Sequence, residues 1–273
     1  MNTKSGFVSI DHANIYYEVA GTGRPIVFIH AGVADSRQWN NEFVRFAPDF
    51  RVLRYDLRGY GKSAPAEGEF SNIEDLTALL DQLDFRQPLV FIGCSLGGGL
   101  AMDFTLANPS RVRALVMVGS GPSGLALDVP GHPQQAAAEE AYKAGNLDLV
   151  AELEAQIWFD GMGRTPQQVD QQMRALALEM NRLALSHDAR QLGKQLPDAE
   201  TPATEQLDQL AIPVLVLIGE HDLPYLHAAA DYMKDNIPSA RKVLLPNAAH
   251  LPNMEHPALF QSVVFSFLNE IPE

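Results

Sequence analysis

The chain has 273 residues and a formal net charge of -14, and Cys94 is its single cysteine. Lys and Arg form no runs, which argues against a nucleic-acid groove or an anionic membrane surface as a partner. One cysteine permits no internal disulfide, and no apolar run approaches the roughly 20 residues of a membrane span. The N-terminal sequence lacks the basic and apolar blocks of a signal peptide. We therefore expect a cytoplasmic protein.

Short apolar runs alternate with amphipathic runs over most of the chain. Residues 7–10 and 14–19 are expected to form a hairpin at the start of a sheet. Further strands are expected, in chain order, at residues 25–30, 51–55, 88–92, 114–118, 214–219 and 242–245. Helices are expected after Asp35-Ser36 and at residues 71–83, 226–236 and 257–269. This alternation predicts an α/β fold with a mostly parallel, eight-stranded sheet covered by helices on both faces.

The segment from residue 121 to residue 206 breaks this alternation because it holds no convincing strand. Helices are expected at residues 134–144 and 147–159, and a third is expected to begin at Thr165-Pro166, a favourable N-cap and first helical residue. Ligands bind at the carboxyl edge of open α/β sheets, so we expect the insertion to lie there. The sequence thus predicts a core domain of residues 1–120 and 207–273 with a helical cap, or lid, of residues 121–206.

The third helix of this insertion has one apolar face at helical spacing. Its residues are Val169, Met173, Leu176, Met180 and Leu183. A single stripe needs one partner surface, so we expect these side chains to pack rather than to contact a substrate. Trp158, Phe159 and Met162 precede a loop at Gly163 and are better candidates for lining a substrate pocket.

A serine lies in a tight connection between a predicted strand and a predicted helix. The sequence there is Gly93-Cys94-Ser95-Leu96-Gly97, the G-x-S-x-G pattern of a nucleophile elbow. Ser95 must adopt a strained backbone conformation, and the neighbouring chain can approach only because residues 93 and 97 have no side chain. The first amides of the helix stay free to bind negative charge. The pattern predicts a nucleophilic serine with part of an anion site, and we interpret Cys94 as a small core residue.

Several separate motifs resemble those of the α/β-hydrolase superfamily. They are the H-G-x-like loop at residues 30–32 with Trp39 behind it, the D-x-R-G-x-G-x-S turn at residues 56–63, the strand-end G-x-x-D at residues 219–222 and the G-H-x(4)-E-x-P-like segment at residues 249–257. Alanine stands at positions 31 and 249, where the family usually has glycine. The narrower resemblance, which includes Trp-x-Asp-Gly at residues 158–161 and Arg-x-Pro at residues 164–166, is to the esterase, enol-lactonase and cofactor-free haloperoxidase branch. The resemblance implies a serine hydrolase whose helical insertion is a lid.

Such chemistry requires a base for Ser95, a group that orients this base and donors for the oxyanion. His250 follows the last predicted strand and precedes the last helix, so its loop can reach back over Ser95, and we prefer it as the base. Asp222 lies just past the end of the strand at residues 214–219 and is preferred as the acid over Glu220. Glu255 is interpreted as a stabilising charge near the start of the last helix.

The oxyanion donors implied by the resemblance are main-chain groups. The N–H of Leu96 follows the nucleophile, and the second donor is the N–H of Gly32, or that of Val33 if Ala31 shifts the loop. The remaining candidates for the substrate pocket come from the loops around these residues. They are His30, for which a structural role is favoured, and Leu223 and Leu251.

No cofactor and no metal site are predicted. The histidines are scattered, no H-E-x-x-H motif or Cys pair exists, no G-x-G-x-x-G follows the first strand, and the glycines at residues 97–99 lack the Lys and Ser/Thr of a P-loop. The expected partner is a small ester or lactone, with no nucleic acid and no membrane, and the protein is expected to be a monomer or a homodimer.

The leading hypothesis is hydrolysis of small carboxylic esters or lactones through an acyl-enzyme. Two alternatives stay open at the level of sequence. The same triad resembles that of carbon-carbon bond hydrolases for ring-fission products and that of perhydrolases. A ligand receptor of the same fold, with vestigial turnover, is a third reading, which the polar outer face of the insertion disfavours because it offers no apolar patch for a partner.

Overall fold

The structure is a computed structural model that describes residues 2–63 and 65–271. Eight strands form one sheet in the order β1-β2-β4-β3-β6-β7-β9-β10, in which only the contacts of β2 are antiparallel. These strands are β1 (Thr3–Ile10), β2 (Ala13–Ala20), β3 (Pro25–Ile29), β4 (Arg51–Tyr55), β6 (Leu89–Cys94), β7 (Val112–Val118), β9 (Val214–Gly219) and β10 (Ala240–Leu245). The predicted eight-stranded, mostly parallel sheet is confirmed.

The helices follow the strands in the alternating order that the sequence predicts. They are α1 (Asn40–Phe46), α2 (Asn72–Gln82), α3 (Leu96–Ala107), α4 (Gln135–Lys143), α5 (Leu147–Ala155), α6 (Gln171–Asp188), α7 (Pro224–Asn236), α8 (Pro252–Glu255) and α9 (Pro257–Glu270). Side-chain N-caps define where several of them begin. For example, the Ser71 hydroxyl accepts a hydrogen bond from the Glu74 N–H at 3.3 Å at the start of α2.

The central strands are buried on both faces, which explains their uninterrupted apolar sequence. Alternate residues of β6 illustrate this: Phe91 packs into a cluster with α2, α3 and α7, whereas Ile92 packs into a second cluster with α1 and α9. Because side chains alternate across a strand, each face of the sheet has its own apolar core.

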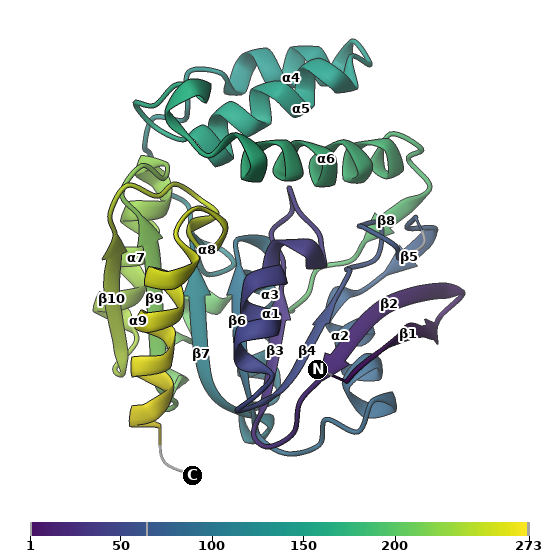
Figure 1. Cartoon of the computed structure of the whole chain (residues 1–273), viewed down its shortest axis with the longest axis vertical. Coiled ribbons are helices and arrows are strands. Elements are labelled where there is room, and N and C mark those ends of the chain that lie inside the picture. Colours follow the sequence, from purple (N-terminus) through teal and green to yellow (C-terminus); the bar gives the residue numbers. More distant parts are fainter. Residues whose placement is uncertain (1, 64, 272–273) are drawn as a thin grey trace.

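Helices α4, α5 and α6, which we call the three upper helices, lie together at one end of the molecule, above the strands (Figure 1). A single π-helical turn, Gln156–Asp160, continues α5. Side chains of α4 and α5 line one cavity together with Ser95, so these helices lie over the carboxyl end of β6. The division into a core of residues 1–120 and 207–273 and a separate cap of residues 121–206 stays a prediction.

Two expectations for this segment are wrong. Residues Gly193–Gln195 form a strand, β8, which pairs in parallel with β5 (Gly68–Phe70) in a small two-stranded sheet. Both strands have three residues, and β8 is exposed throughout, so neither has the apolar alternation that marks a strand in a sequence. The third helix begins at Gln171 rather than at Pro166, because Asp170 caps α6 through the N–H groups of Gln172 and Met173.

Thr165 caps only the short 3-10 turn Pro166–Gln168, after which Val169 returns to an extended conformation. Of the predicted apolar stripe, Val169 and Met180 belong to the buried core, and Met173 and Leu176 pack against it. The interpretation of these four side chains as packing residues is therefore consistent with their positions. In the part of the chain that the structure describes, no helix combines the length and the apolar character needed to cross a membrane.

Candidate active site

Ser95 occupies the connection between β6 and α3 in a conformation that side chains rarely adopt, with φ 51° and ψ −116°. Its N–H donates to the carbonyl oxygen of Val118 at 2.9 Å, which holds the turn against β7. The flanking glycines are required by close backbone contacts. A Cβ on Gly93 would lie 2.4 Å from the Gly97 carbonyl oxygen, and one on Gly97 would lie 2.4 Å from that of Ile29.

His250 and Asp222 are in direct contact through their side chains. The Nδ1 atom of His250 lies 3.0 Å from Oδ2 of Asp222, and both residues are almost completely buried. An ionised carboxylate only accepts hydrogen bonds, so Nδ1 carries the proton and Nε2 is left with a free lone pair. The second carboxylate oxygen of Asp222 accepts the N–H of Leu223 at 2.8 Å, which fixes the orientation of the acid.

Gly119, at the end of β7, lets this pair pack against the sheet. A Cβ at this position would lie 2.9 Å from Nδ1 of His250 and 3.0 Å from Oδ2 of Asp222. Its φ of 50° is also one that glycine adopts more readily than other residues. The sequence did not single out Gly119, since the reason for the glycine lies in residues far along the chain.

Trp158 connects the π-helical turn to His250. The two rings lie with their centroids 4.6 Å apart, and the His250 N–H donates to the Trp158 carbonyl oxygen at 3.2 Å. The Cys94 thiol contacts the carbonyl oxygen of His250 at 3.5 Å, which brings the histidine loop against the residue before Ser95. Burial raises the pKa of the Cys94 thiol to about 12, so the group is protonated and unreactive at neutral pH, in agreement with its interpretation as a core residue.

The two predicted oxyanion donors belong to residues that face each other. A Cβ placed on Gly32 would lie 3.7 Å from the Cβ of Leu96. Leu96 is the first residue of α3, so its N–H has no acceptor within the helix. Ala31 is not available as a donor because its N–H is bound to Oε1 of Gln38 at 2.9 Å. The alanine that replaces the usual glycine is thus a fully buried residue of a fixed loop.

The side chain of His30 makes hydrogen bonds that hold neighbouring backbone in place. The side chain is completely buried, its Nε2 accepts the N–H of Leu57 at 3.0 Å, and Nδ1 therefore donates to the Ala31 carbonyl oxygen at 2.8 Å. Burial lowers the pKa of the imidazole, which keeps it neutral. His30 lines neither cavity described below, and these contacts agree with the structural role that the sequence analysis favours for it.

Ala249 is the other alanine that replaces a glycine of the family motif. Its N–H donates to Oε1 of Glu255 at 2.6 Å, and the second carboxylate oxygen of Glu255 pairs with Arg164 at 2.7 Å. Arg164 also donates to the carbonyl oxygens of Phe159 and Asp160. Burial raises the pKa of Glu255, and Arg164 opposes that shift. Glu255 thus ties the loop before His250 to the π-helical turn.

A cavity of about 830 Å³ contains Ser95. Its apolar walls come from α4, α5, the π-helical turn and the start of α7. The apolar and aromatic residues that line it include Ala138, Val150, Ile157, Trp158, Leu223, Tyr225 and Leu226, and polar and charged side chains from α4 and α5 line it as well: Gln135, Glu139, Lys143 and Glu154. Trp158 and Leu223 were expected there. The candidates Phe159, Met162 and Leu251 do not line it, since Phe159 and Leu251 are buried in a core cluster and Met162 packs against one.

The sequence analysis missed Val150, Glu154 and Ile157, which line this cavity from one side of α5 and the π-helical turn. Their spacing of four and three residues is that of one helical face, and it continues to the predicted Trp158. This periodicity was a usable signal, whereas the contribution of Tyr225 and Leu226 depends on the packing of α7.

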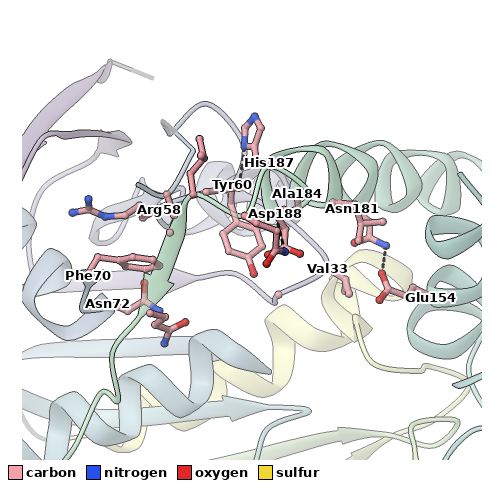
Figure 2. Close-up of a pocket in the computed structure, with 18 residues that line it drawn as sticks. Val33, Arg58, Tyr60, Phe70, Asn72, Glu154, Asn181, Ala184, His187 and Asp188 are labelled. Carbon is pink, nitrogen blue, oxygen red and sulfur yellow. Dashed lines mark hydrogen bonds between the residues drawn. The ribbon is translucent and has the colours of Figure 1, made fainter. Parts of the chain in front are cut away.

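A second cavity of about 320 Å³ is lined in part by the oxyanion loop. Gly32, Val33, Tyr60, Glu154 and Asn181 are among the residues that line it (Figure 2). Glu154 lines both cavities, so the two spaces adjoin at this side chain. Within residues 2–63 and 65–271, no group of three or more His, Cys, Asp or Glu side chains is arranged to hold a metal ion.

Comparison with known proteins assigns the family. A family model described as the alpha/beta hydrolase fold matches residues 24–257. The chain belongs to this family. The expected resemblance and fold class are confirmed, and the protein is an enzyme of the α/β-hydrolase family.

Three proteins similar to this α/β-hydrolase have names that state the reactions they catalyse. The pimeloyl-(acyl-carrier protein) methyl ester esterase of Pectobacterium atrosepticum is 28% identical, with 93% of this chain and 98% of that one aligned. The 2-hydroxy-6-oxo-6-(2'-aminophenyl)hexa-2,4-dienoic acid hydrolase of Metapseudomonas resinovorans is 24% identical, with 96% and 90% aligned. The solved structure of Est816, an N-acyl homoserine lactone degrading enzyme, has a TM-score of 0.75 and 26% identity, with 96% and 100% covered.

Proposed function

We propose that this α/β-hydrolase cleaves small carboxylic esters or lactones through an acyl-enzyme, with Ser95 as nucleophile, His250 as general base and acid, and Asp222 as the orienting acid. The observation that carries the proposal is the buried contact of His250 Nδ1 with Asp222 at 3.0 Å, next to the wall of the cavity that contains Ser95. The names of the esterase and lactonase relatives support the same bond type.

In the first half-reaction, the Ser95 hydroxyl oxygen attacks the ester carbonyl carbon and its proton passes to Nε2 of His250. Asp222 accepts a hydrogen bond from the Nδ1–H of His250 throughout and stabilises the imidazolium that forms. The N–H groups of Leu96 and Gly32 donate to the oxyanion, and the loss of one such donor typically costs about 2.7 to 4 kcal/mol of barrier. When the tetrahedral intermediate collapses, the carbon-oxygen bond breaks and His250 returns the proton to the leaving alcohol.

In the second half-reaction, water takes the place of the alcohol. His250 removes a proton from the water as it attacks the acyl carbon, and the second tetrahedral intermediate releases the carboxylic acid and the Ser95 hydroxyl. In a lactone the acid and the alcohol stay joined as one hydroxy acid. The apolar walls of the larger cavity accommodate an apolar acyl or alcohol group by removing its surface from water.

The test compares Ser95→Ala with the matched variant Ser186→Ala on p-nitrophenyl butyrate. Ser186 is exposed on α6, and its hydroxyl donates to the carbonyl oxygen of Leu183 in the same helix at 2.7 Å. We expect Ser95→Ala to lose activity by several orders of magnitude and Ser186→Ala to keep it. An alkyl fluorophosphonate should add one phosphonyl group to the native protein and none to Ser95→Ala. Retention of most activity in Ser95→Ala would refute the assignment.

The carbon-carbon bond hydrolase and the perhydrolase are the alternative reactions. Rates measured side by side on an ester, an enol-lactone and a ring-fission product compare ester hydrolysis with carbon-carbon bond cleavage. Peracid formation from hydrogen peroxide tests the perhydrolase activity. A clear preference for the ring-fission product would replace the ester proposal. The receptor alternative predicts release of one acyl group per protein followed by a stable adduct, whereas a hydrolase should turn over at about 1 per second or faster at saturating ester.

A further inference from the structure

Glu154 occupies a distinctive place in the proposed active site. It belongs to α5 and lines both the cavity with Ser95 and the cavity beside Gly32 and Val33. A substrate whose carbonyl carbon lies at Ser95 and whose carbonyl oxygen lies at Leu96 and Gly32 has these two cavities as the space for its acyl and alcohol groups. A group that occupies the region where they adjoin lies beside the Glu154 carboxylate.

The pairing of Glu154 differs from that of its acidic neighbours. Each neighbour in α5 and the π-helical turn has an arginine partner: Asp148 pairs with Arg182, and Glu152 and Asp160 pair with Arg174. Glu154 has none among the described residues. Its carboxylate instead accepts a hydrogen bond from the Asn181 side-chain amide, at 2.7 Å to Oε2 (Figure 2).

An amide satisfies one lone pair of a carboxylate but does not neutralise its charge. Burial raises the pKa of Glu154, and the nearby charge of Asp188 raises it further. Among the described residues that line the smaller cavity, the one arginine is Arg58, and it is bound to Asp75 by two hydrogen bonds of 2.6 and 2.8 Å. The half-buried carboxylate of Glu154 thus faces substrate space without an ion pair among the described residues. Lys143 also lines the larger cavity, but it is not paired with Glu154.

We propose that Glu154 selects esters or lactones that carry a positively charged group, which it binds where the two cavities adjoin. A cation there supplies the missing counter-charge and relieves the penalty of the buried carboxylate, whereas a substrate carboxylate is repelled. The inference rests on the proposed function, because it takes Ser95 as the point of attack. It goes further by assigning the charge of the substrate.

The test uses pairs of esters with the same shape and different charge. One pair is butyrylcholine and its carbon isostere, in which a tert-butyl group replaces trimethylammonium. The other pair has the same two groups at the end of the acyl chain of a p-nitrophenyl ester, so that charge is tested on both sides of the scissile bond. Quaternary ammonium is permanently charged and cannot attack the ester. We expect kcat/KM to favour the cationic member of at least one pair by about tenfold or more at low salt.

Glu154→Gln should reduce this ratio to nearly one, because it keeps the shape and the bond with Asn181 but removes the charge. Asp148→Asn is the matched control, since Asp148 has the same charge on the same helix and is exposed, with 85% of its side chain accessible. It should leave the ratio of the native protein unchanged. The preference should also weaken as salt is raised.

Two results overturn the inference. One is hydrolysis of both members of each pair at equal rates, and the other is a cation preference that survives Glu154→Gln. In both results esters are turned over, so the proposed function stands. Failure of every ester, including p-nitrophenyl butyrate, would refute the proposed function and the substrate charge with it.

Discussion

The carboxylate of Glu42 accepts a hydrogen bond from the side-chain amide of Asn253 at 3.0 Å, although the two residues are 211 positions apart. Neither residue is exposed to solvent. Asn253 lies three residues after His250, at the start of α8, and Glu42 lies in α1. A polar contact inside the apolar core between α1 and α9 thus connects the histidine loop to a helix that precedes β4.

Gln38 extends this contact to the oxyanion loop. Its amide donates to Oδ1 of Asn253 at 3.2 Å, and its Oε1 accepts the Ala31 N–H at 2.9 Å. Gln261 in α9 donates to the second oxygen of Glu42 at 3.0 Å. Buried hydrogen bonds between side chains hold a single arrangement because a broken bond leaves a desolvated polar group. The network fixes the loops of Ala31 and His250 relative to each other.

Glu42→Gln should change the pH dependence of stability. Burial raises the pKa of Glu42 to about 7 in the folded protein, whereas the unfolded chain titrates near 4.3. A raised acid pKa stabilises the fold at pH values below the unfolded pKa, and this contribution is lost as pH rises through about 7. Between about pH 4.5 and pH 8, the native protein should lose on the order of 3 kcal/mol relative to the glutamine variant.

The measurement is urea unfolding of both proteins over this pH range, with the exposed Glu74→Gln as control. Only the difference between the variant and the native protein matters, because all other titrating groups cancel. A stability difference for Glu42→Gln that stays constant with pH would show that Glu42 does not titrate in this range in the folded protein.

Asp222→Asn should show which of the two acidic residues after β9, Glu220 or Asp222, orients His250. An asparagine keeps the size of the side chain but can hold His250 in the wrong tautomer, and we expect kcat to fall by roughly three to four orders of magnitude. Glu220→Gln is the control, because the Glu220 carboxylate is bound to the Asn247 N–H at 2.9 Å. Steady-state rates on one p-nitrophenyl ester decide between them. A larger loss in Glu220→Gln would transfer the role of the acid.

Gly97→Ala and Gly99→Ala make the same chemical change two residues apart in α3 with opposite expected results. A Cβ on Gly97 would lie 2.4 and 2.6 Å from the carbonyl oxygens of Ile29 and His30. A Cβ on Gly99 would have its nearest neighbour, the Gly121 carbonyl oxygen, 3.8 Å away. Gly97→Ala should therefore distort the elbow and the oxyanion loop and lose most activity. Gly99→Ala should stabilise the protein by about 0.5 to 1 kcal/mol, since alanine favours the helix.

Thermal unfolding and ester turnover on the same preparations measure both effects. Unimpaired activity in Gly97→Ala would mean that the loop at Ile29 can move away from α3. A destabilised Gly99→Ala would show that this part of the helix is closer to Gly121 than the structure places it.

The sequence was most informative where a local rule is strong. The apolar run at residues 88–92 and the glycines around Ser95 predicted β6 and its turn, because burial on both faces and a strained backbone each restrict the residues that fit. The start of α6 was misjudged because Thr165 and Asp170 are both good N-caps. The local sequence does not determine which cap begins the long helix.

Contacts between distant residues account for most of what the sequence could not supply. Nothing local marks Glu42, Gln38 and Asn253 as partners. Glu154 looks like any other acid on a helix until the arginines of its neighbours are placed. Among the pocket candidates, Phe159 adjoins Trp158 in sequence but turns into the core, because the π-helical turn changes the face that each residue presents.

Arg174→Met should be strongly destabilising, whereas Arg182→Met on the same helix should have little effect. The Arg174 guanidinium contacts the Asp160 carboxylate at 2.8 and 2.9 Å, and only 1% of the Asp160 side chain is exposed. Methionine removes the partner of this buried charge, which typically costs about 3 to 5 kcal/mol. Arg182 pairs with Asp148 on the surface, where such pairs contribute about 0 to 1 kcal/mol. Asp160 ends the turn that carries Trp158, so Arg174→Met should also raise KM for esters. Urea unfolding and steady-state kinetics of both variants test this, and equal small losses of stability would contradict it.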